Sequence, residues 1–294
     1  MAVVIAGTGK GNGGAGAFGL APGVKILPLR VVNDKAPAAR EMLGGNSMSS
    51  AIRHAADSDA KIINISMGGP SGGWRDAEAV EYAVSKGKLV FAAVGNDGNK
   101  GNQVEFPAGY PGVVGVAAVD QNIKATEESQ RGPQVDLAAP GDNIVASCKG
   151  GSGLCRSHGT SDATALASAS AALIWSVHPD WTANQVLRVL INTAGGPKSG
   201  EKRSDTIGYG VVRPRIALQN PGDPGPPNVS PLPELASASP TPAAGGTPQA
   251  ATGKGGDNSL LSKRNVLAAS IAMGAAAVVG VPLLIFATRR RKAL

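Results

Sequence analysis

A long run of small side chains behind one serine constrains the fold of this chain more than any other feature. Ser161 stands in the segment Gly159-Thr-Ser-Asp-Ala-Thr-Ala165, and the stretch from there to Trp175 consists largely of alanine and serine. Side chains of this size let a buried helix lie close under a sheet. The leading glycine predicts a turn that places Ser161 in the first turn of this helix, where free backbone N–H groups and the helix dipole favour negative charge.

Two interpretations of Ser161 follow from this position. A serine at the start of a helix commonly caps it, by accepting a hydrogen bond from a backbone N–H group. A serine in the same place can also act as a nucleophile, because an oxyanion formed beside it would meet preorganised donors. Serine catalysis depends on several groups that act together, so the choice between the two requires other segments of the chain.

The wider pattern predicts an α/β fold. Apolar segments that read as strands alternate with segments that read as helices, and 41 glycines with only 3% aromatic residues indicate helices packed closely on strands. Such alternation predicts a parallel sheet covered by helices on both faces. The expected strands are 24–32, 61–65, 88–93 and 113–118, and the expected helices lie near 47–57, 74–86, 161–177 and 182–193.

The segment 159–165 resembles the nucleophile motif of the subtilisin-like serine proteases, which usually reads Gly-Thr-Ser-Met-Ala-Thr-Pro. Three other segments resemble that family in the same chain order. Residues 19–31 resemble the turn and strand after the family's histidine helix, and residues 63–69 resemble the strand that lines the substrate cleft. Residues 90–98 resemble the strand and loop that carry the oxyanion-hole asparagine. The resemblance extends from Met1 to about Leu218.

The resemblance implies a subtilisin-like fold and the hydrolysis of peptide bonds in a protein or peptide substrate. Ser161 would be the nucleophile, and the Asn96 side-chain amide would stabilise the oxyanion together with the Ser161 backbone N–H group. Asn96 also begins an Asn-Asp-Gly sequence that is common in turns, but the apolar strand before it favours the catalytic role. The substrate backbone would pair as an added strand with Ser66, Met67 and Gly68, and Gly68 and Gly69 would permit its close approach.

Within the family, the Ser-Asp-Ala-Thr variant and the membrane tail described below most resemble the mycosins, the proteases of type VII secretion systems in actinobacteria. Membrane components of such a system are therefore expected partners. Asp162 and Ala165 replace the usual methionine and proline of the motif. We interpret neither change as inactivating, because an acidic residue is well placed in the first turn of a helix.

The general base is the missing part of this site. Subtilisin-like chains carry the triad in the order Asp, His, Ser, and Met1–Gly7 resembles the helix directly after the family's His-Gly-Thr segment. We therefore expect the histidine and the aspartate of the triad upstream of Met1. No signal peptide opens this chain, so we expect that segment upstream of Met1 as well. His54, His158 and His178 are not expected to replace the base. The alternative is a catalytically inactive fragment or a structural subunit of the secretion complex.

Composition changes near Asn220. Residues 220–262 are rich in Pro, Ala, Gly, Ser and Thr, which predicts a disordered linker after a peptidase domain at 1–219. Residues 263–294 follow, with an uncharged apolar stretch at about 266–288 that is long enough for a transmembrane helix. The alternative, a buried alanine-rich core helix, would have no core to join after such a linker.

Basic residues around this stretch predict its orientation. The run 289–292 follows it and Lys263-Arg264 precedes it, so the C-terminus is expected in the cytoplasm and the peptidase domain outside the cell membrane. These six residues supply +6 of the formal net charge of +7. The positive charge therefore belongs to the membrane anchor and gives no reason to expect nucleic acid as a partner.

The two cysteines, Cys148 and Cys155, bracket a glycine-rich loop just before the nucleophile segment. In a domain outside the cytoplasm they are expected to form a disulfide. A pair of free thiols is the alternative. Two cysteines without an adjacent histidine cluster do not predict a metal site.

The glycine run at 7–14 contains a G-x-G-x-x-G pattern that also occurs in dinucleotide-binding proteins. No helix pattern and no Lys-Ser/Thr pair follows it, so we expect a surface loop and no nucleotide cofactor. The serine segment lacks the second glycine of the G-x-S-x-G motif, which excludes the α/β-hydrolase arrangement.

Overall fold

The computed structural model describes residues 1–31, 47–148 and 153–232 of the chain. Most of the expected linker and the whole of the expected transmembrane helix lie outside the described residues. Within the described part, no helix combines the length and the apolar character that crossing a bilayer requires.

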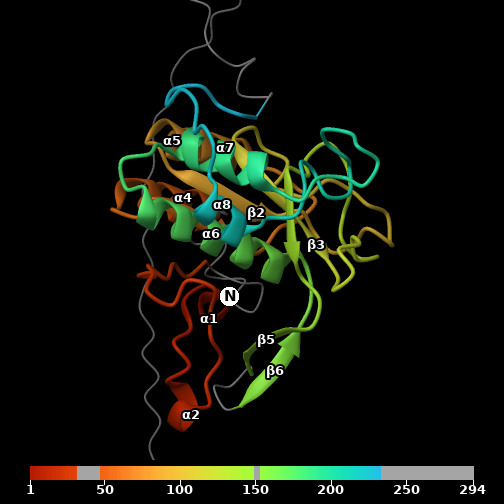
Figure 1. The fold of residues 1–294 in the computed structure, drawn as a ribbon. Helices are drawn as coiled ribbons and strands as arrows, with labels where there is room; N and C mark the ends of the chain where they lie inside the picture. The colour runs from red at the N-terminus through yellow and green to blue at the C-terminus, as the bar shows by residue number, and fades with distance from the viewer. Residues whose placement is uncertain (32–46, 149–152, 233–294) are drawn as a thin grey trace, which may run out of the picture. The chain divides into compact units, whose positions relative to one another are not determined.

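A four-stranded parallel sheet forms the centre of the fold (Figure 1). Its strands follow one another in sequence order, with Ile63 opposite Val90, Val90 opposite Val113, and Ala118 opposite Ala139. Every residue of the two central strands is buried, as expected of parallel strands that are covered on both faces. The strands are β1 (Ile62–Ile65), β2 (Leu89–Ala93), β3 (Val113–Val119) and β4 (Leu137–Pro140).

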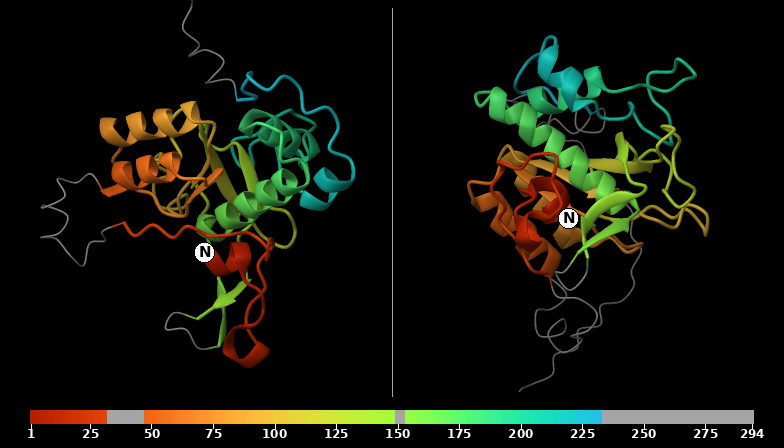
Figure 2. Two further views of the ribbon diagram at one scale, coloured as in Figure 1. Left: turned by 90° about the vertical axis from the view of Figure 1, so that its left-hand side faces the viewer. Right: turned by 60° about the horizontal axis from the view of Figure 1, so that its bottom comes forward.

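Helices cover both faces of this sheet, which confirms the predicted architecture (Figure 2). One face packs against α4 (Ser47–Asp57) and α5 (Trp74–Ser85). The other packs against α6 (Thr160–Val177), α7 (Ala183–Thr193) and α8 (Pro214–Gln219). Each face therefore has its own apolar core.

The helix α6 lies directly against the sheet and touches all four strands. Ala163, Ala167 and Ala171 are fully buried and share one core cluster with Val114 and Val116 of β3. A helix approaches a sheet this closely only where the side chains between them are small. The predicted reason for the alanine and serine run is therefore confirmed.

Smaller elements lie beside α6. The short helix α1 (Ala2–Ala6) packs Val4 and Ile5 against Ala165 and Ala169. The glycine run expected as a loop contains a short helical turn, α2 (Gly11–Gly14). An antiparallel hairpin, β5 (Ile144–Ser147) and β6 (Leu154–Ser157), leads into α6.

The prediction of a strand at residues 24–32 is wrong for its described part. Residues 25–31 make no backbone hydrogen bond to any other described residue. The apolar pattern is present, but a strand also needs a paired neighbour. A cavity of about 540 Å³ separates this segment from β1, the strand next to it.

The prediction of a disordered linker from Asn220 onward is also wrong for residues 221–232. Arg188 of α7 donates hydrogen bonds to the carbonyl oxygens of Pro224 (2.7 Å) and Val229 (2.6 Å). Gln185 donates to Gly225 at 2.9 Å, and Leu232 is buried in the core beside α6. Proline lacks a backbone donor but keeps its carbonyl acceptor, so side chains of α7 can fix a proline-rich segment.

The close contact of α6 with the sheet gives a testable prediction. Ala167→Leu should lower the free energy of unfolding by about 1–3 kcal/mol, because extra methylene groups have no room in a packed core. Ala172→Leu on the same helix should change it by less than about 1 kcal/mol, because Ala172 faces the 540 Å³ cavity. Urea unfolding of both variants measures the difference, and equal effects would contradict the close packing of α6.

Candidate active site

Ser161 lies in the first turn of α6 and is half-buried. Thr160 is the first residue of this helix, and Gly159 directly precedes it. Gly159 has a φ of 126°, a conformation that favours glycine. A methyl group at this position would lie 3.1 Å from the Asn96 Oδ1 atom. The glycine therefore permits both the sharp turn into the helix and the approach of Asn96.

Asn96 is held by its amide oxygen. Its Oδ1 atom accepts a hydrogen bond from the Thr160 backbone N–H group (2.9 Å) and another from the Thr160 hydroxyl (3.1 Å). Asn96 follows Gly95 at the end of β2 and is exposed. Its Nδ2 group makes no hydrogen bond to another described residue, so both amide donors remain open beside the first turn of α6.

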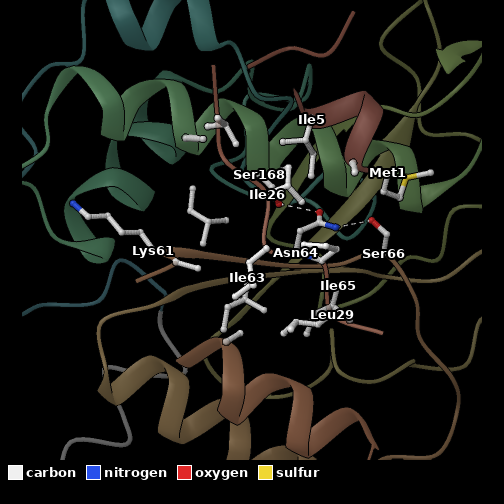
Figure 3. Close-up of a pocket in the computed structure, with 18 of the residues that line it drawn as sticks. Met1, Ile5, Ile26, Leu29, Lys61, Ile63, Asn64, Ile65, Ser66 and Ser168 are labelled. Carbon is white, nitrogen blue, oxygen red and sulfur yellow. Dashed lines mark hydrogen bonds between the residues drawn. The ribbon is translucent and has the colours of Figure 1, made fainter. Parts of the chain in front are cut away.

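Ser161 and Ser66 are linked reciprocally. The Ser161 hydroxyl donates to the Ser66 carbonyl oxygen at 3.0 Å, and the Ser66 hydroxyl donates to the Ser161 carbonyl oxygen at 2.9 Å. Asn64 supports this link by donating to the Ser66 hydroxyl, while it accepts from Ser168, each at 3.0 Å (Figure 3). The structure thus joins the end of β1 to the start of α6.

The expected substrate-binding segment continues from Ser66. Met67 and Gly68 are exposed. Gly69 already pairs with Phe106, because its N–H group donates to the Phe106 carbonyl (3.1 Å) and its carbonyl accepts from the Phe106 N–H group (2.8 Å). Of the expected substrate-binding segment, Gly69 is therefore already paired within the chain.

No histidine is hydrogen-bonded to Ser161 within the described residues. His54 is exposed on α4, and His178 stacks on Trp181 with ring centroids 3.8 Å apart. His158 is exposed just before the turn into α6. The Ser161 hydroxyl accordingly donates its hydrogen bond to a backbone carbonyl oxygen and not to the side chain of a base.

The acidic residue next to Ser161 is buried. Asp162 is 1% exposed and accepts a hydrogen bond from the Ser157 hydroxyl at 3.0 Å. Burial raises the pKa of Asp162, and the Ser157 hydrogen bond, the Met1 ammonium group and His158 oppose this only in part. Ser157 belongs to β6, so Asp162 ties the hairpin to α6.

A second carboxylate, Glu105, lies between the expected substrate-binding segment and the loop that carries Asn96, and no sequence motif predicts it. Methyl groups placed on Gly68 and Gly95 would come within 2.8 and 2.6 Å of the Glu105 carboxyl group. Gln130 donates to this carboxylate at 3.0 Å. Burial and the charge of Asp97 raise the pKa of Glu105. The proximity of Glu105 to Gly68 and Gly95 arises from tertiary packing, which a local sequence motif does not predict.

The predicted disulfide is present. Cys148 and Cys155 are bonded, with their Cα atoms 4.9 Å apart, and the bond lies at the loop end of the β5–β6 hairpin. The alternative of two free thiols does not apply to this structure. The bridge fixes the hairpin that supplies Ser157 to Asp162.

Comparison with known proteins agrees with this arrangement. The family model described as "Subtilase family" matches residues 1–210. Together with the α/β fold and the placement of Ser161, Asn96 and Ser66, this match shows that the chain belongs to the subtilase family of serine proteases.

The chain is also similar to individual members of the family. It is 34% identical over 185 residues to subtilisin E of Bacillus subtilis, an alignment that covers 62% of this chain and 47% of the relative. The chain thus spans about half the length of that protein. It is also similar to the solved MycP3 protease from the type VII (ESX-3) secretion system, with a TM-score of 0.60 and 29% identity over 74% of this chain and 71% of that one. Fervidolysin of Fervidobacterium pennivorans aligns with a TM-score of 0.62 and 28% identity, over 74% of this chain and 35% of its own.

The buried carboxyl group next to Ser161 gives a prediction about pH. An acid whose pKa is raised on folding contributes stability that is present below its unfolded pKa and is lost as the pH rises through the folded pKa. Asp162→Asn keeps an acceptor for Ser157 and removes the charge. The variant should therefore have a higher Tm than the parent at neutral pH, and the difference should shrink towards pH 4.

Thermal unfolding at several pH values between about 4 and 7.5 measures this effect. Asp59→Asn is the matched control, because Asp59 is exposed between α4 and β1 and its replacement also removes one carboxylate. A gain in Tm that is equal at all pH values would show that burial of the charge is not the cause.

Proposed function

We propose that this chain carries the nucleophile and the oxyanion hole of a membrane-anchored serine endopeptidase. The observation that supports this most strongly is the fixed amide of Asn96. Thr160 holds its oxygen with two hydrogen bonds and leaves the Nδ2 donors open beside Ser161. An amide that only stabilised a turn would not need its orientation set by the first turn of another element.

The mechanism follows from this geometry. The Ser161 hydroxyl attacks the scissile carbonyl carbon and forms a tetrahedral intermediate, whose oxyanion accepts from Asn96 Nδ2 and from the Ser161 backbone N–H group. Collapse of the intermediate releases the amine and leaves an acyl-enzyme, which water hydrolyses. A base must take the serine proton, and we place that base, with its orienting aspartate, upstream of Met1.

The substrate binds as an extended strand. Ser66, Met67 and Gly68 lie at the end of β1, directly beside Ser161, and Met67 and Gly68 are exposed. Pairing of their backbone groups with the substrate would align a peptide bond with the nucleophile. This binding mode suits protein and peptide substrates and requires no cofactor.

The catalytic proposal is tested on the polypeptide translated from the coding sequence extended upstream of Met1. Cleavage of a fluorogenic peptide should be abolished by Ser161→Ala. Asn96→Ala should lower kcat about 10²–10³-fold with little change in KM, since the lost donor acts on the transition state. His158→Ala is the control and should leave the rate unchanged.

The 294-residue chain itself should react weakly or not at all with a fluorophosphonate probe, because serine needs a base to become nucleophilic. Strong labelling that Ser161→Ala removes would contradict the upstream position of the base. An in-frame stop codon directly before Met1 would contradict it as well.

A membrane anchor is the second part of the proposal. The uncharged stretch at about 266–288 and the basic run at 289–292 support a single span with the peptidase domain outside the cell. The likeness to the MycP3 protease supports a role beside membrane components of a type VII secretion system. Deletion of residues 263–294 should move the protein from the carbonate-resistant membrane fraction to the soluble fraction, and its retention would count against the anchor.

A non-catalytic subunit is the alternative function. One observation favours it. The Ser161 hydroxyl donates a hydrogen bond to the Ser66 carbonyl oxygen, and no described histidine is hydrogen-bonded to Ser161. In that case the domain would bind its partners through the subtilase fold alone. Retention of secretion by a Ser161→Ala strain, together with its loss on deletion of the gene, would identify this role.

A further inference from the structure

The carboxyl group of Glu105 lies against both segments that border the scissile bond in the proposed mechanism. A methyl group placed on Gly68 would come within 2.8 Å of the Glu105 Oε2 atom, and one placed on Gly95 within 2.6 Å of its carboxyl carbon. Gly68 belongs to the segment proposed to pair with the substrate, and Gly95 directly precedes Asn96. The carboxylate therefore lies between the substrate-binding segment and the oxyanion donor.

Backbone hydrogen bonds fix Glu105 in this position. The next residue, Phe106, exchanges two backbone hydrogen bonds with Gly69, of 2.8 and 3.1 Å. The Glu105 carbonyl oxygen accepts from the Gly109 N–H group at 2.9 Å. The carboxylate is thus carried by a segment that is tied directly to the strand end beside Ser161.

The two glycines next to Glu105 have different causes. Gly95 has a φ of 111°, a conformation that favours glycine whatever the space around it. Gly68 does not have such a φ, and a methyl group there would meet the Glu105 carboxylate and, at 3.2 Å, the Phe106 carbonyl oxygen. A substrate side chain that passes Gly68 would therefore reach the carboxylate with no side chain of Gly68 in between.

Glu105 lacks a positive partner within the described residues. The ion pairs of that part of the chain involve other acids, and the nearby Lys100 is paired with Asp97. Gln130 is 1% exposed and donates to Glu105 Oε1 at 3.0 Å, while its own amide oxygen is buried without a described donor. Burial and the charge of Asp97 raise the pKa of Glu105, so its anion is poorly compensated.

The substrate residue that supplies the scissile carbonyl would lie next to this carboxylate. Its carbonyl oxygen has to reach Asn96 and the Ser161 N–H group, while the substrate backbone pairs beside Ser66–Gly68. Its side chain would then enter between Gly68 and Gly95. A lysine or arginine has an apolar stem for this passage and a cationic head that donates to a carboxylate. A neutral side chain would leave the half-buried carboxylate without a positive partner.

We propose that Glu105 selects substrates with lysine or arginine on the acyl side of the scissile bond. The inference rests on the proposed function, because it takes Ser161 and Asn96 as the groups that act on this bond. Gln130 orients the carboxylate through Oε1, and Oε2, the oxygen nearest to Gly68, would accept from the cationic head. Glu105 is in this role a specificity-determining residue and takes no part in bond cleavage.

Matched fluorogenic peptides test the proposal on the polypeptide translated from the coding sequence extended upstream of Met1. The peptides differ only in the residue before the scissile bond, which is lysine, arginine, norleucine or glutamate. Norleucine keeps the lysine stem without the charge. The value of kcat/KM should be at least about tenfold higher for lysine and arginine than for norleucine, and lowest for glutamate. Equal values for lysine and norleucine would overturn the proposal.

Variants assign the preference to one carboxylate. Glu105→Gln keeps the shape of the side chain and should lower the lysine-to-norleucine ratio of kcat/KM to about one, whereas Glu105→Asp should retain part of the preference. Glu127→Gln is the matched control, since Glu127 is exposed and its replacement removes the same charge. It should keep the full ratio. A ratio that Glu105→Gln leaves unchanged would show that another group selects the cation.

Peptide binding separates this proposal from the catalytic one. The Ser161→Ala variant of the same polypeptide should bind a fluorescein-labelled lysine peptide at least about tenfold more tightly than its norleucine counterpart, by fluorescence anisotropy. Adding Glu105→Gln should remove this difference. If the difference is present and no peptide is cleaved, the catalytic proposal fails and the role of Glu105 stands. If Ser161 cleaves the peptides without preference for a cation, the role of Glu105 fails alone.

Discussion

The close packing of α6 on the sheet is the constraint on which the rest of the structure depends. Fully buried alanines at 163, 167 and 171 bring the helix axis near the strands. Only at that distance can the first turn of α6 reach the ends of β1 and β2. The hydrogen bonds between Ser161 and Ser66 and between Thr160 and Asn96 are consequences of this distance.

Much of the fold and of the site could be predicted from the sequence, for an identifiable reason. Buried parallel strands such as β2 are continuous apolar runs, and the helices α6 and α7 begin at recognisable residues, including a capping box at Thr182 and Gln185. Asn96 comes shortly after β2, and Ser161 lies in the first turn of α6. Local pattern therefore fixes their positions, and the structure adds their relative orientation.

The features that could not be predicted depend on contacts between distant segments. Residues 24–31 have an apolar pattern but no paired neighbour, and the proline-rich segment after Asn220 is ordered by side chains of α7. Glu105 reaches Gly68 and Gly95 only through the tertiary arrangement. In each case the outcome depends on residues outside the local segment, beyond the range of periodicity or turn chemistry.

The segment after Asn220 also determines how the domain would carry mechanical load. Arg188 donates hydrogen bonds to three carbonyl oxygens of this segment, those of Pro224, Pro226 and Val229. Leu232, further along the chain, is buried. Tension applied at residue 232 would act first on the buried Leu232 and then on the hydrogen bonds of Arg188. These contacts lie between residue 232 and α8 along the chain, so force would have to break them before it pulled directly on α8.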